Sequence, residues 1–239
     1  MENPEGQMRI DYGLDAPGLV QAFIFGGLTL ALLGLFSESL KLPELFSGFI
    51  NPGFCFVFTG LTMVFYSYFG KFRARDHLIQ SLQLKGHETL LDLGCGRGLL
   101  LIGGAKSLPQ GKAIGIDLWS QKDLSNNSEK AVLQNAQLEG VRGRVEIING
   151  DMRKIPLPNA SVDVVVASMA IHNIPTRSGR EEAVREAVRV LKPGGKMALL
   201  DFKSTGQYAD VAKSLGIKNV RRPFSLWCFP PSRIVYGEK

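Results

Sequence analysis

The chain has 239 residues, a net charge of +6 and three cysteines, Cys55, Cys95 and Cys228. This length allows one ordinary domain plus a small additional segment, and the cysteine spacing excludes the common zinc patterns and a disulfide framework. Charge is unevenly distributed, because residues 1–70 carry a net −4 and residues 71–239 a net +10. The asymmetry predicts two parts with different roles, an apolar N-terminal segment and a C-terminal domain.

The apolar segment contains two uncharged runs, at about residues 17–36 and 50–69. Since about 20 apolar residues cross the core of a bilayer as a helix, we expect a membrane hairpin with two spans. Tyr66 and Tyr68 lie near the end of the second run, where aromatic side chains of membrane proteins gather at the interface. The alternative is a helical lid that packs on a soluble domain.

Basic residues follow the second run directly, at Lys71, Arg73 and Arg75, whereas the connection between the runs has only Lys41. Cytoplasmic loops of membrane proteins are enriched in Lys and Arg. We therefore expect a membrane protein whose C-terminal domain lies on the cytoplasmic side. The basic cluster is expected to contact lipid headgroups, so membrane lipids are predicted partners.

Residues 71–239 alternate between apolar strands and helices, which is typical of an α/β fold with a doubly wound, mostly parallel sheet. We expect a first helix over 72–84 that continues the second span. The predicted strands cover residues 89–93, 113–117, 145–148, 162–168 and 196–202. The predicted helices that follow them cover residues 99–107, 125–138, 180–191 and 207–215. Residues 220–227 and 233–237 are predicted to form an antiparallel pair at one edge.

A glycine-rich loop, LLDLGCGRG, follows the first predicted strand. Gly94, Gly96 and Gly98 permit a tight turn and a close approach of a ligand to the backbone, and Asp92 lies at the strand end, where open α/β sheets bind ligands. The dinucleotide-binding pattern G-x-G-x-x-G requires glycine at the position of Leu99. Leu99 therefore disfavours a nucleotide-dependent oxidoreductase, which is kept as an alternative function.

Two further acidic residues lie at the ends of the next strands. Asp117, in GIDLW, can accept hydrogen bonds from both hydroxyls of a ribose. Asp151, in GDMRKIPLP, can accept a hydrogen bond from an adenine amino group, with Met152 stacked beside it. Trp119 either offers an apolar wall to the adenine or packs between a helix and the sheet. Strand capping alone does not explain three carboxylates and a glycine loop at successive strand ends.

The motifs LLDLGCGRG, GIDLW, GDMRKIPLP, VDVVVASMAIHNI and REAVRVLKPGGKMALLDF resemble those of the class I S-adenosylmethionine (SAM)-dependent methyltransferases, and most closely the ubiquinone/menaquinone C-methyltransferases. The resemblance covers nearly all of residues 71–239. It implies a Rossmann-like, seven-stranded sheet whose last strand is antiparallel, SAM as the cofactor and no metal ion. The SAM-binding residues expected on this basis are Asp92, Gly94, Cys95, Gly96, Gly98, Asp117, Leu118, Trp119, Asp151, Met152 and Ser168.

Methyl transfer requires an aligned acceptor, and a base where the acceptor is protonated. His172, just beyond the fourth strand, is the candidate base because imidazole titrates near neutrality. The competing interpretation is a structural histidine that ties down its loop. Asp201, at the end of the fifth strand, is a second candidate catalytic residue and is expected to face the edge of the cleft. Arg75 stays open as a clamp for the SAM carboxylate.

The predicted function is a membrane-anchored enzyme that moves a methyl group from SAM to a small lipophilic acceptor and leaves S-adenosylhomocysteine. Nucleic acid is not an expected partner, because residues 168–171 read SMAI where nucleic-acid amino-methyltransferases carry Asn/Asp-Pro-Pro-aromatic. The net positive charge of residues 71–239 is compatible with binding to anionic lipid as well as to nucleic acid. An alternative from a different class is a membrane-anchored SAM-binding scaffold without turnover.

Overall fold

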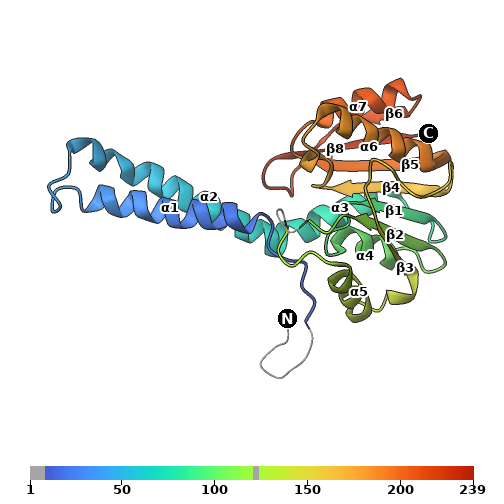
Figure 1. Cartoon of the computed structure of the whole chain (residues 1–239), viewed down its shortest axis with the longest axis horizontal. Coiled ribbons are helices and arrows are strands. Elements are labelled where there is room, and N and C mark those ends of the chain that lie inside the picture. Colours follow the sequence, from blue (N-terminus) through green and yellow to red (C-terminus); the bar gives the residue numbers. More distant parts are fainter. Residues whose placement is uncertain (1–8, 121–123) are drawn as a thin grey trace.

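The computed structural model describes residues 9–120 and 124–239, which form an α/β domain and a helical hairpin that projects from it (Figure 1). The hairpin comprises α1 (Pro17–Leu35) and α2 (Ile50–Phe65), which are joined through a 3-10 helix, η1 (Glu44–Phe49).

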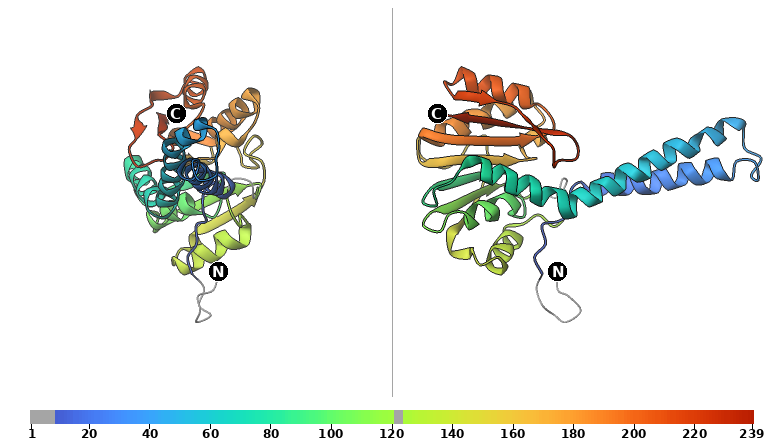
Figure 2. Two further views of the ribbon diagram at one scale, coloured as in Figure 1. Left: turned by 90° about the vertical axis from the view of Figure 1, so that its left-hand side faces the viewer. Right: turned by 180° about the vertical axis from the view of Figure 1, so that it is seen from behind.

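The second hairpin helix runs on into the domain without a break (Figure 2). After α2 the chain makes one π-helical turn, η2 (Tyr66–Gly70), and continues as α3 (Lys71–Leu82). The α3 residues Leu78 and Leu82 are fully buried in the domain core. The predicted continuation of the second apolar run into a domain helix is therefore confirmed.

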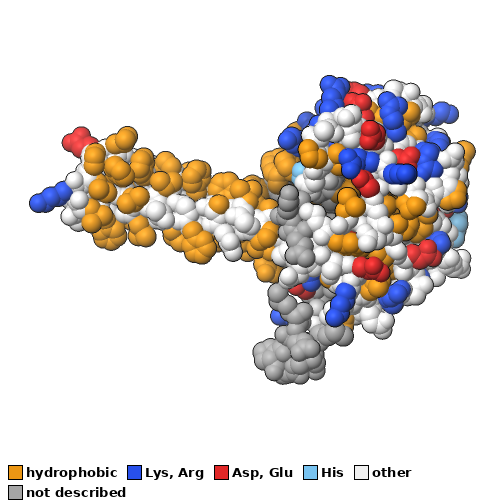
Figure 3. Space-filling view, in the orientation of Figure 1, with side chains coloured by type: hydrophobic (Ala, Val, Ile, Leu, Met, Phe, Trp, Pro, Cys, Tyr) orange, Lys and Arg blue, Asp and Glu red, His pale blue; other side chains and the backbone are white. Residues whose placement is uncertain are grey.

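Small residues let α1 and α2 pack closely. A Cβ atom on Gly27 would lie 2.7 Å from the Gly53 carbonyl oxygen, and a Cβ on Gly53 would lie 2.5 Å from the Ala31 nitrogen. Glycine and alanine at such crossings are typical of helices that pack in lipid. The outer face of the pair is apolar (Figure 3), with Phe25 65% and Phe58 72% exposed.

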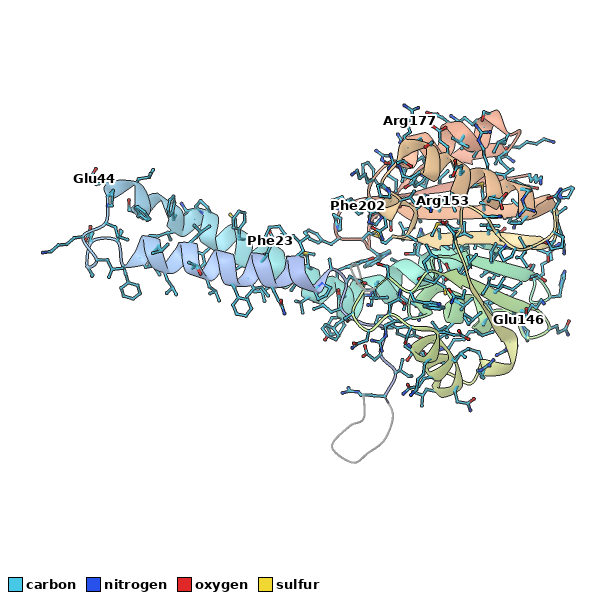
Figure 4. The ribbon with its side chains drawn as sticks, viewed as in Figure 1. Phe23, Glu44, Glu146, Arg153, Arg177 and Phe202 are labelled. Carbon is cyan, nitrogen blue, oxygen red and sulfur yellow. The ribbon has the colours of Figure 1, made fainter. Side chains whose placement is uncertain are left out.

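Two helical stretches, Pro17–Leu35 and the continuous helix Glu44–Leu82, are long and apolar enough to cross a membrane, a criterion that core helices and signal sequences also meet. A helical lid would be covered by the domain on which it packs. The outer face of the hairpin, in contrast, is not covered by the domain (Figures 1 and 3). The charged residue Glu44 lies at the far tip (Figure 4).

The domain contains an eight-stranded sheet in the described residues, in the order β3-β2-β1-β4-β5-β8-β6, with β7 paired to β8. β1 to β5 run parallel, and β6, β7 and β8 pair antiparallel. The strands are β1 (Thr89–Leu93), β2 (Lys112–Asp117), β3 (Val145–Asn149), β4 (Val162–Ser168), β5 (Leu191–Asp201), β6 (Lys218–Arg221), β7 (Phe224–Ser225) and β8 (Ser232–Glu238). This arrangement confirms the predicted Rossmann-like α/β fold with an antiparallel edge.

Helices cover both faces of the sheet, so the fold is doubly wound. One buried core lies under α3, α4 and α5, and the other under α6 and α7. These helices are α4 (Leu99–Lys106), α5 (Glu129–Leu138), α6 (Arg177–Val190) and α7 (Thr205–Ser214). The chain leaves β1 for β2 on one side and reaches β4 on the other, which places the topological switch point of the sheet at β1.

The observed boundaries differ from the predicted ones at identifiable residues. The predicted strand at 220–227 is divided into β6 and β7, because Pro223 between them has no N–H to donate to a ladder. α5 begins at Glu129 because the Ser128 hydroxyl accepts a hydrogen bond from the Ala131 nitrogen (3.3 Å). The extra, two-residue β7 accounts for eight strands rather than seven.

Two residues near the hairpin base differ from their predicted roles. Tyr66, expected at a lipid interface, is only 8% exposed, whereas Tyr68 is 62% exposed. Lys71, expected to contact headgroups, is 5% exposed, and its Nζ donates hydrogen bonds to the carbonyl oxygens of Tyr12 (3.1 Å) and Gly13 (2.6 Å). Burial lowers the pKa of this lysine. Lys71 therefore fastens the N-terminal segment to α3.

Candidate active site

A cavity of about 750 Å³ lies at the carboxyl ends of the parallel strands, beside the base of the hairpin. The domain side of its wall carries the acidic residues Asp92, Asp117 and Asp151. The hairpin side carries apolar residues, among them Leu19 and Met63. One cavity thus joins a polar floor at the switch point of the sheet to an apolar wall on the hairpin.

The glycine loop wraps closely around one end of this cavity. Gly94, with φ of 70°, is in a backbone region that side chains rarely adopt, and its Cβ would lie 2.5 Å from the Ala170 Cβ. Gly96 also has positive φ, 54°, and Gly98 is the N-cap residue that directly precedes α4. Gly94 and Gly96 line the cavity, so the loop exposes backbone to a ligand at the point predicted from its spacing.

Asp92 is the most unusual group in the site. It is 1% exposed, and among the residues that the structure describes its Oδ2 has no hydrogen-bond partner. Burial, and then the nearby Asp117, raises the pKa of Asp92 to about 8. A buried carboxylate without a partner is unfavourable in its charged form. The arrangement therefore suits a ligand that brings a positive charge to Oδ2.

Asp117 holds the loops around the site. Its Oδ2 accepts a hydrogen bond from the Gly96 nitrogen (2.8 Å), and its Oδ1 accepts from the Trp119 nitrogen (2.7 Å) and the Asn127 Nδ2 (3.3 Å). Each carboxylate oxygen has two lone pairs, and Asp117 lines the cavity. The carboxylate can therefore accept further hydrogen bonds from a ligand while it positions the glycine loop.

The apolar wall next to Asp117 comes from Leu118. Leu118 is 62% exposed and lines the cavity. Trp119, predicted as a possible wall, is not among the described lining residues and packs against the core under α3 to α5. Its backbone has a positive φ of 59°. The packing agrees with the competing interpretation for Trp119, contact between a helix and the sheet.

Asp151 and Met152 both line the cavity, as predicted. The Arg153 Nε donates a hydrogen bond to Asp151 Oδ2 (2.9 Å), and this arginine holds the pKa of Asp151 below its usual value. Arg153 itself also lines the cavity. Asp151 is therefore ionised near neutrality and can accept a hydrogen bond from a ligand.

His172 and Asp201 form a pair in which only His172 reaches the cavity. His172 Nδ1 lies 2.8 Å from Asp201 Oδ1. Among the described residues, Nδ1 has no partner with the geometry of a hydrogen bond. Asp201 also accepts hydrogen bonds from the backbone nitrogens of His172 (3.1 Å) and Phe202 (2.9 Å) and from the Tyr208 hydroxyl (3.2 Å).

Asp201 is 1% exposed and is not among the described lining residues, which corrects the expectation that it faces the cleft. It positions the imidazole from behind. His172 lines the cavity, and its ring meets Phe202 edge-to-face with centroids 4.5 Å apart. Phe202 lies on the side of the domain that faces the hairpin (Figure 4).

Three other residues complete the comparison with the predicted site. Cys95 and Ser168 line the cavity. Burial raises the pKa of the Cys95 thiol well above its usual value, so it is not a nucleophile. Arg75 also lines the cavity, but its Nε donates to Asp76 (2.7 Å). Among the described residues, no cluster of His, Cys, Asp and Glu is suited to a metal ion.

The sequence did not reveal two contributors to the site. Asn127 is 5% exposed, lines the cavity and donates to Asp117. The second contributor is a strap, which we define as residues 9–16. Within it, Asp11 forms an ion pair with Arg97 of the glycine loop (3.1 Å), and the Asp11 nitrogen donates to Asn135 Oδ1 (3.1 Å). The strap lies in the segment that was assigned to the hairpin, and its partners are distant in the chain.

The site fits SAM by its own chemistry. The unpartnered carboxylate of Asp92 suits a cationic ligand, and the backbone of Gly94 and Gly96 leaves room beside it. Asp117 and Asp151 offer separate hydrogen-bond acceptors for a ribose and an adenine.

Comparison with known proteins points to the same group. Residues 91–199 match the methyltransferase-domain family. The chain is 34% identical over 128 residues to a demethylmenaquinone methyltransferase from Lactobacillus johnsonii, covering 53% of this chain and 49% of that protein. It is 35% identical over 130 residues to a 27-O-demethylrifamycin SV methyltransferase from Amycolatopsis mediterranei, covering 54% and 44%. The chain thus spans about half the length of these curated relatives.

Solved structures show the same fold. A SAM-dependent methyltransferase from Aquifex aeolicus superimposes with a TM-score of 0.55 at 22% identity, covering 69% of this chain and 88% of that one. A putative O-methyltransferase from Nostoc punctiforme gives a TM-score of 0.61 at 15% identity and covers 94% and 72%. Together with the ordered motifs and the geometry of the site, the methyltransferase-domain match over residues 91–199 and these relatives support a class I SAM-dependent methyltransferase.

Proposed function

We propose that this protein is a membrane-anchored methyltransferase that uses SAM to methylate a small, lipophilic acceptor, with its catalytic domain on the cytoplasmic side. The observation that carries the proposal is the single cavity, in which a buried, unpartnered Asp92 at one end faces apolar hairpin residues at the other. The domain end suits the cofactor, and the hairpin end suits an acceptor that partitions into lipid.

Anchoring is supported by the form of the hairpin. Its apolar outer face projects away from the domain, and charged side chains such as Glu44 lie at the far tip (Figures 3 and 4). A protein in water rarely exposes so large an apolar surface. Arg73 and Arg75 at the base, with Lys41 at the tip, favour a cytoplasmic domain.

In this mechanism SAM supplies an electrophilic methyl group on a sulfonium sulfur. Asp92 would hold the positive end of the cofactor, the loop at Gly94 and Gly96 would accommodate it against the backbone, and Asp117 and Asp151 would accept hydrogen bonds from its nucleoside. These contacts align the methyl group with an acceptor that lies against the hairpin side of the cavity.

His172 removes the proton where the acceptor atom carries one. Asp201 faces Nδ1, so Nε2 is the nitrogen that accepts the proton, and the buried Asp201 carboxylate stabilises the resulting imidazolium. The proton lost by the acceptor would thus remain on His172 Nε2, while Asp201 faces the other ring nitrogen.

The relatives support a small-molecule acceptor, since two of them are named for a demethylmenaquinone and a demethylrifamycin. The test is transfer of tritium from methyl-labelled SAM, by the full chain in detergent, into a total lipid extract. We expect labelled product in the organic phase. Label only in water-soluble acceptors would refute the lipophilic substrate, and SAM binding without product would favour the scaffold alternative.

A matched pair of arginine variants tests the cofactor site. Gly96 and Gly140 both have positive φ, 54° and 72°, but a Cβ on Gly96 would lie 2.9 Å from Leu124, whereas one on Gly140 meets no described atom within 4 Å. Gly96→Arg should abolish SAM binding, and Gly140→Arg should retain it. Both variants should stay in the membrane pellet after alkaline carbonate extraction. Equal SAM affinity in both would remove the proposed site, and release of the wild-type chain would refute anchoring.

A further inference from the structure

A second hollow lies on the hairpin itself and adjoins the active-site cavity. Its wall includes Leu19, Ala22, Phe23 and Gly26 of α1, and Phe56 of α2. Leu19 also lines the active-site cavity, so the two hollows share this residue as a wall. We call this hollow the hairpin groove; it follows α1 away from the domain, and Phe23 lies part of the way along the hairpin (Figure 4).

Small residues make the floor of the hairpin groove. Ala22, Gly26 and Thr29 follow one another at helical spacing along α1, and a Cβ on Gly26 meets no described atom within 4 Å. The Thr29 hydroxyl donates a hydrogen bond to the Phe25 carbonyl oxygen (2.9 Å), so this polar side chain does not need a partner from the groove. The groove is thus open and apolar over its length.

We propose that the hairpin groove binds the hydrocarbon tail of the methyl acceptor, which is therefore an amphiphile with one long chain. This inference rests on the proposed function and specifies its substrate class. From Leu19 to Leu30 the groove extends about 16 Å along α1, given a rise of about 1.5 Å per residue. A head group beside His172 and a tail along α1 would follow a path past Leu19 from the catalytic domain into the hairpin.

The polarity of the path supports this orientation of the substrate. The carboxylates and His172 lie at the domain end, Leu19 and Met63 lie in the middle, and the groove beyond them is apolar. A molecule with a short tail would leave the groove empty, whereas a long tail would be held beside α1 with its head at the site. The groove therefore selects acceptors by tail length.

The test uses phenylalanine in two places on the hairpin. Gly26→Phe fills the groove. Gly48→Phe adds the same side chain in open space near the hairpin tip, since a Cβ there also meets no described atom within 4 Å. With tritiated SAM and a total lipid extract, Gly26→Phe should raise the KM for lipid at least about tenfold, the change expected when roughly two methylene groups lose an apolar surface. Gly48→Phe should match the wild type.

A second measurement does not depend on turnover. A hexadecyl alcohol with a mid-chain diazirine is photo-cross-linked to the detergent-solubilised full chain, and the labelled residues are identified by mass spectrometry. We expect labelling within residues 19–30 that hexadecanol suppresses and butanol does not, and that Gly26→Phe removes. Labelling spread evenly over the hairpin, or an unchanged KM in Gly26→Phe, would overturn the groove. Specific labelling without methyl transfer would instead refute the proposed enzyme and leave the groove in place.

Discussion

The affinity for SAM should depend strongly on pH through Asp92. Burial and the neighbouring Asp117 raise the pKa of this carboxyl to about 8 in the free protein, so it is mostly protonated at neutral pH. Its unpartnered Oδ2 can pair with a cation only when it is ionised. The protein that binds SAM tightly is therefore the deprotonated form, and binding should lower the pKa of Asp92 and release a proton.

The size of the effect follows from the fraction of ionised protein. With a pKa of about 8, roughly 1% of Asp92 is ionised at pH 6 and half at pH 8, and the apparent Kd varies inversely with this fraction. The Kd for SAM should thus fall roughly 50-fold from pH 6 to pH 8 and only about twofold more at higher pH. The direction of the change in Kd is fixed, because raising the pH can only increase the ionised fraction of Asp92.

Isothermal titration calorimetry in two buffers of different ionisation enthalpy measures both the Kd and the proton release. Asp92→Asn removes the carboxylate and should bind weakly with little dependence on pH. His172 also lines the cavity, so His172→Asn serves as a control and should keep the dependence. If the wild type and Asp92→Asn show the same pH dependence, or if no proton is released, the assigned role of Asp92 is wrong.

Three further predictions concern positioning and stability. Asp201→Asn should lower kcat by about 10²–10⁴-fold for an acceptor that must lose a proton, with little change in KM, because the carboxylate acts only through His172; an equal change in KM would contradict this. Gly53→Leu should separate the hairpin helices and raise protease sensitivity, since even a Cβ would lie 2.5 Å from Ala31, whereas Gly48→Leu should not. Ser128→Ala removes the cap of α5 and should lower the free energy of unfolding by about 1 kcal/mol in a denaturant titration, with methyl transfer unchanged.

The strands and most helices could be predicted because the apolar pattern of each strand is nearly continuous. β1 and β4 have the predicted bounds, and their residues are almost wholly buried. The errors come from local chemistry that the pattern does not contain. Pro223 divides one predicted strand, and the Ser128 cap shortens one predicted helix. Such single residues change where an element begins without changing the fold.

The cofactor side of the site could be predicted because parallel strands end at one edge of a sheet, so Asp92, Asp117 and Asp151 converge there. Which neighbouring side chain faces the cavity could not be predicted. Leu118 and Trp119 are adjacent, and of the two only Leu118 is among the described residues that line the cavity. Asp201 was similarly ambiguous, because a strand end can face either a cleft or a supporting residue.

The strap could not be predicted, because two of its hydrogen bonds join residues more than 120 positions apart in the chain. The Asp11 nitrogen donates to Asn135, and the Tyr12 hydroxyl donates to Glu139. The strap connects the base of the hairpin to the catalytic domain through side-chain contacts. The strap pairs with the glycine loop through Asp11 and Arg97, and it supplies the carbonyl oxygens that satisfy the buried Lys71.

A domain cut at residue 71 would therefore leave Lys71 without the carbonyl oxygens of Tyr12 and Gly13, and Arg97 without the carboxylate of Asp11. Removing one partner of a buried charge is strongly destabilising, because the remaining charge stays out of water. Lys71 lies at the start of α3, in the same continuous helix as the hairpin, and Arg97 lies in the loop that lines the cofactor cavity. The same short strap thus contacts the base of the hairpin and the cofactor loop. A change in the angle of the hairpin would move groups that are bonded to that loop, so the positions of the hairpin and of the cofactor loop depend on one set of contacts.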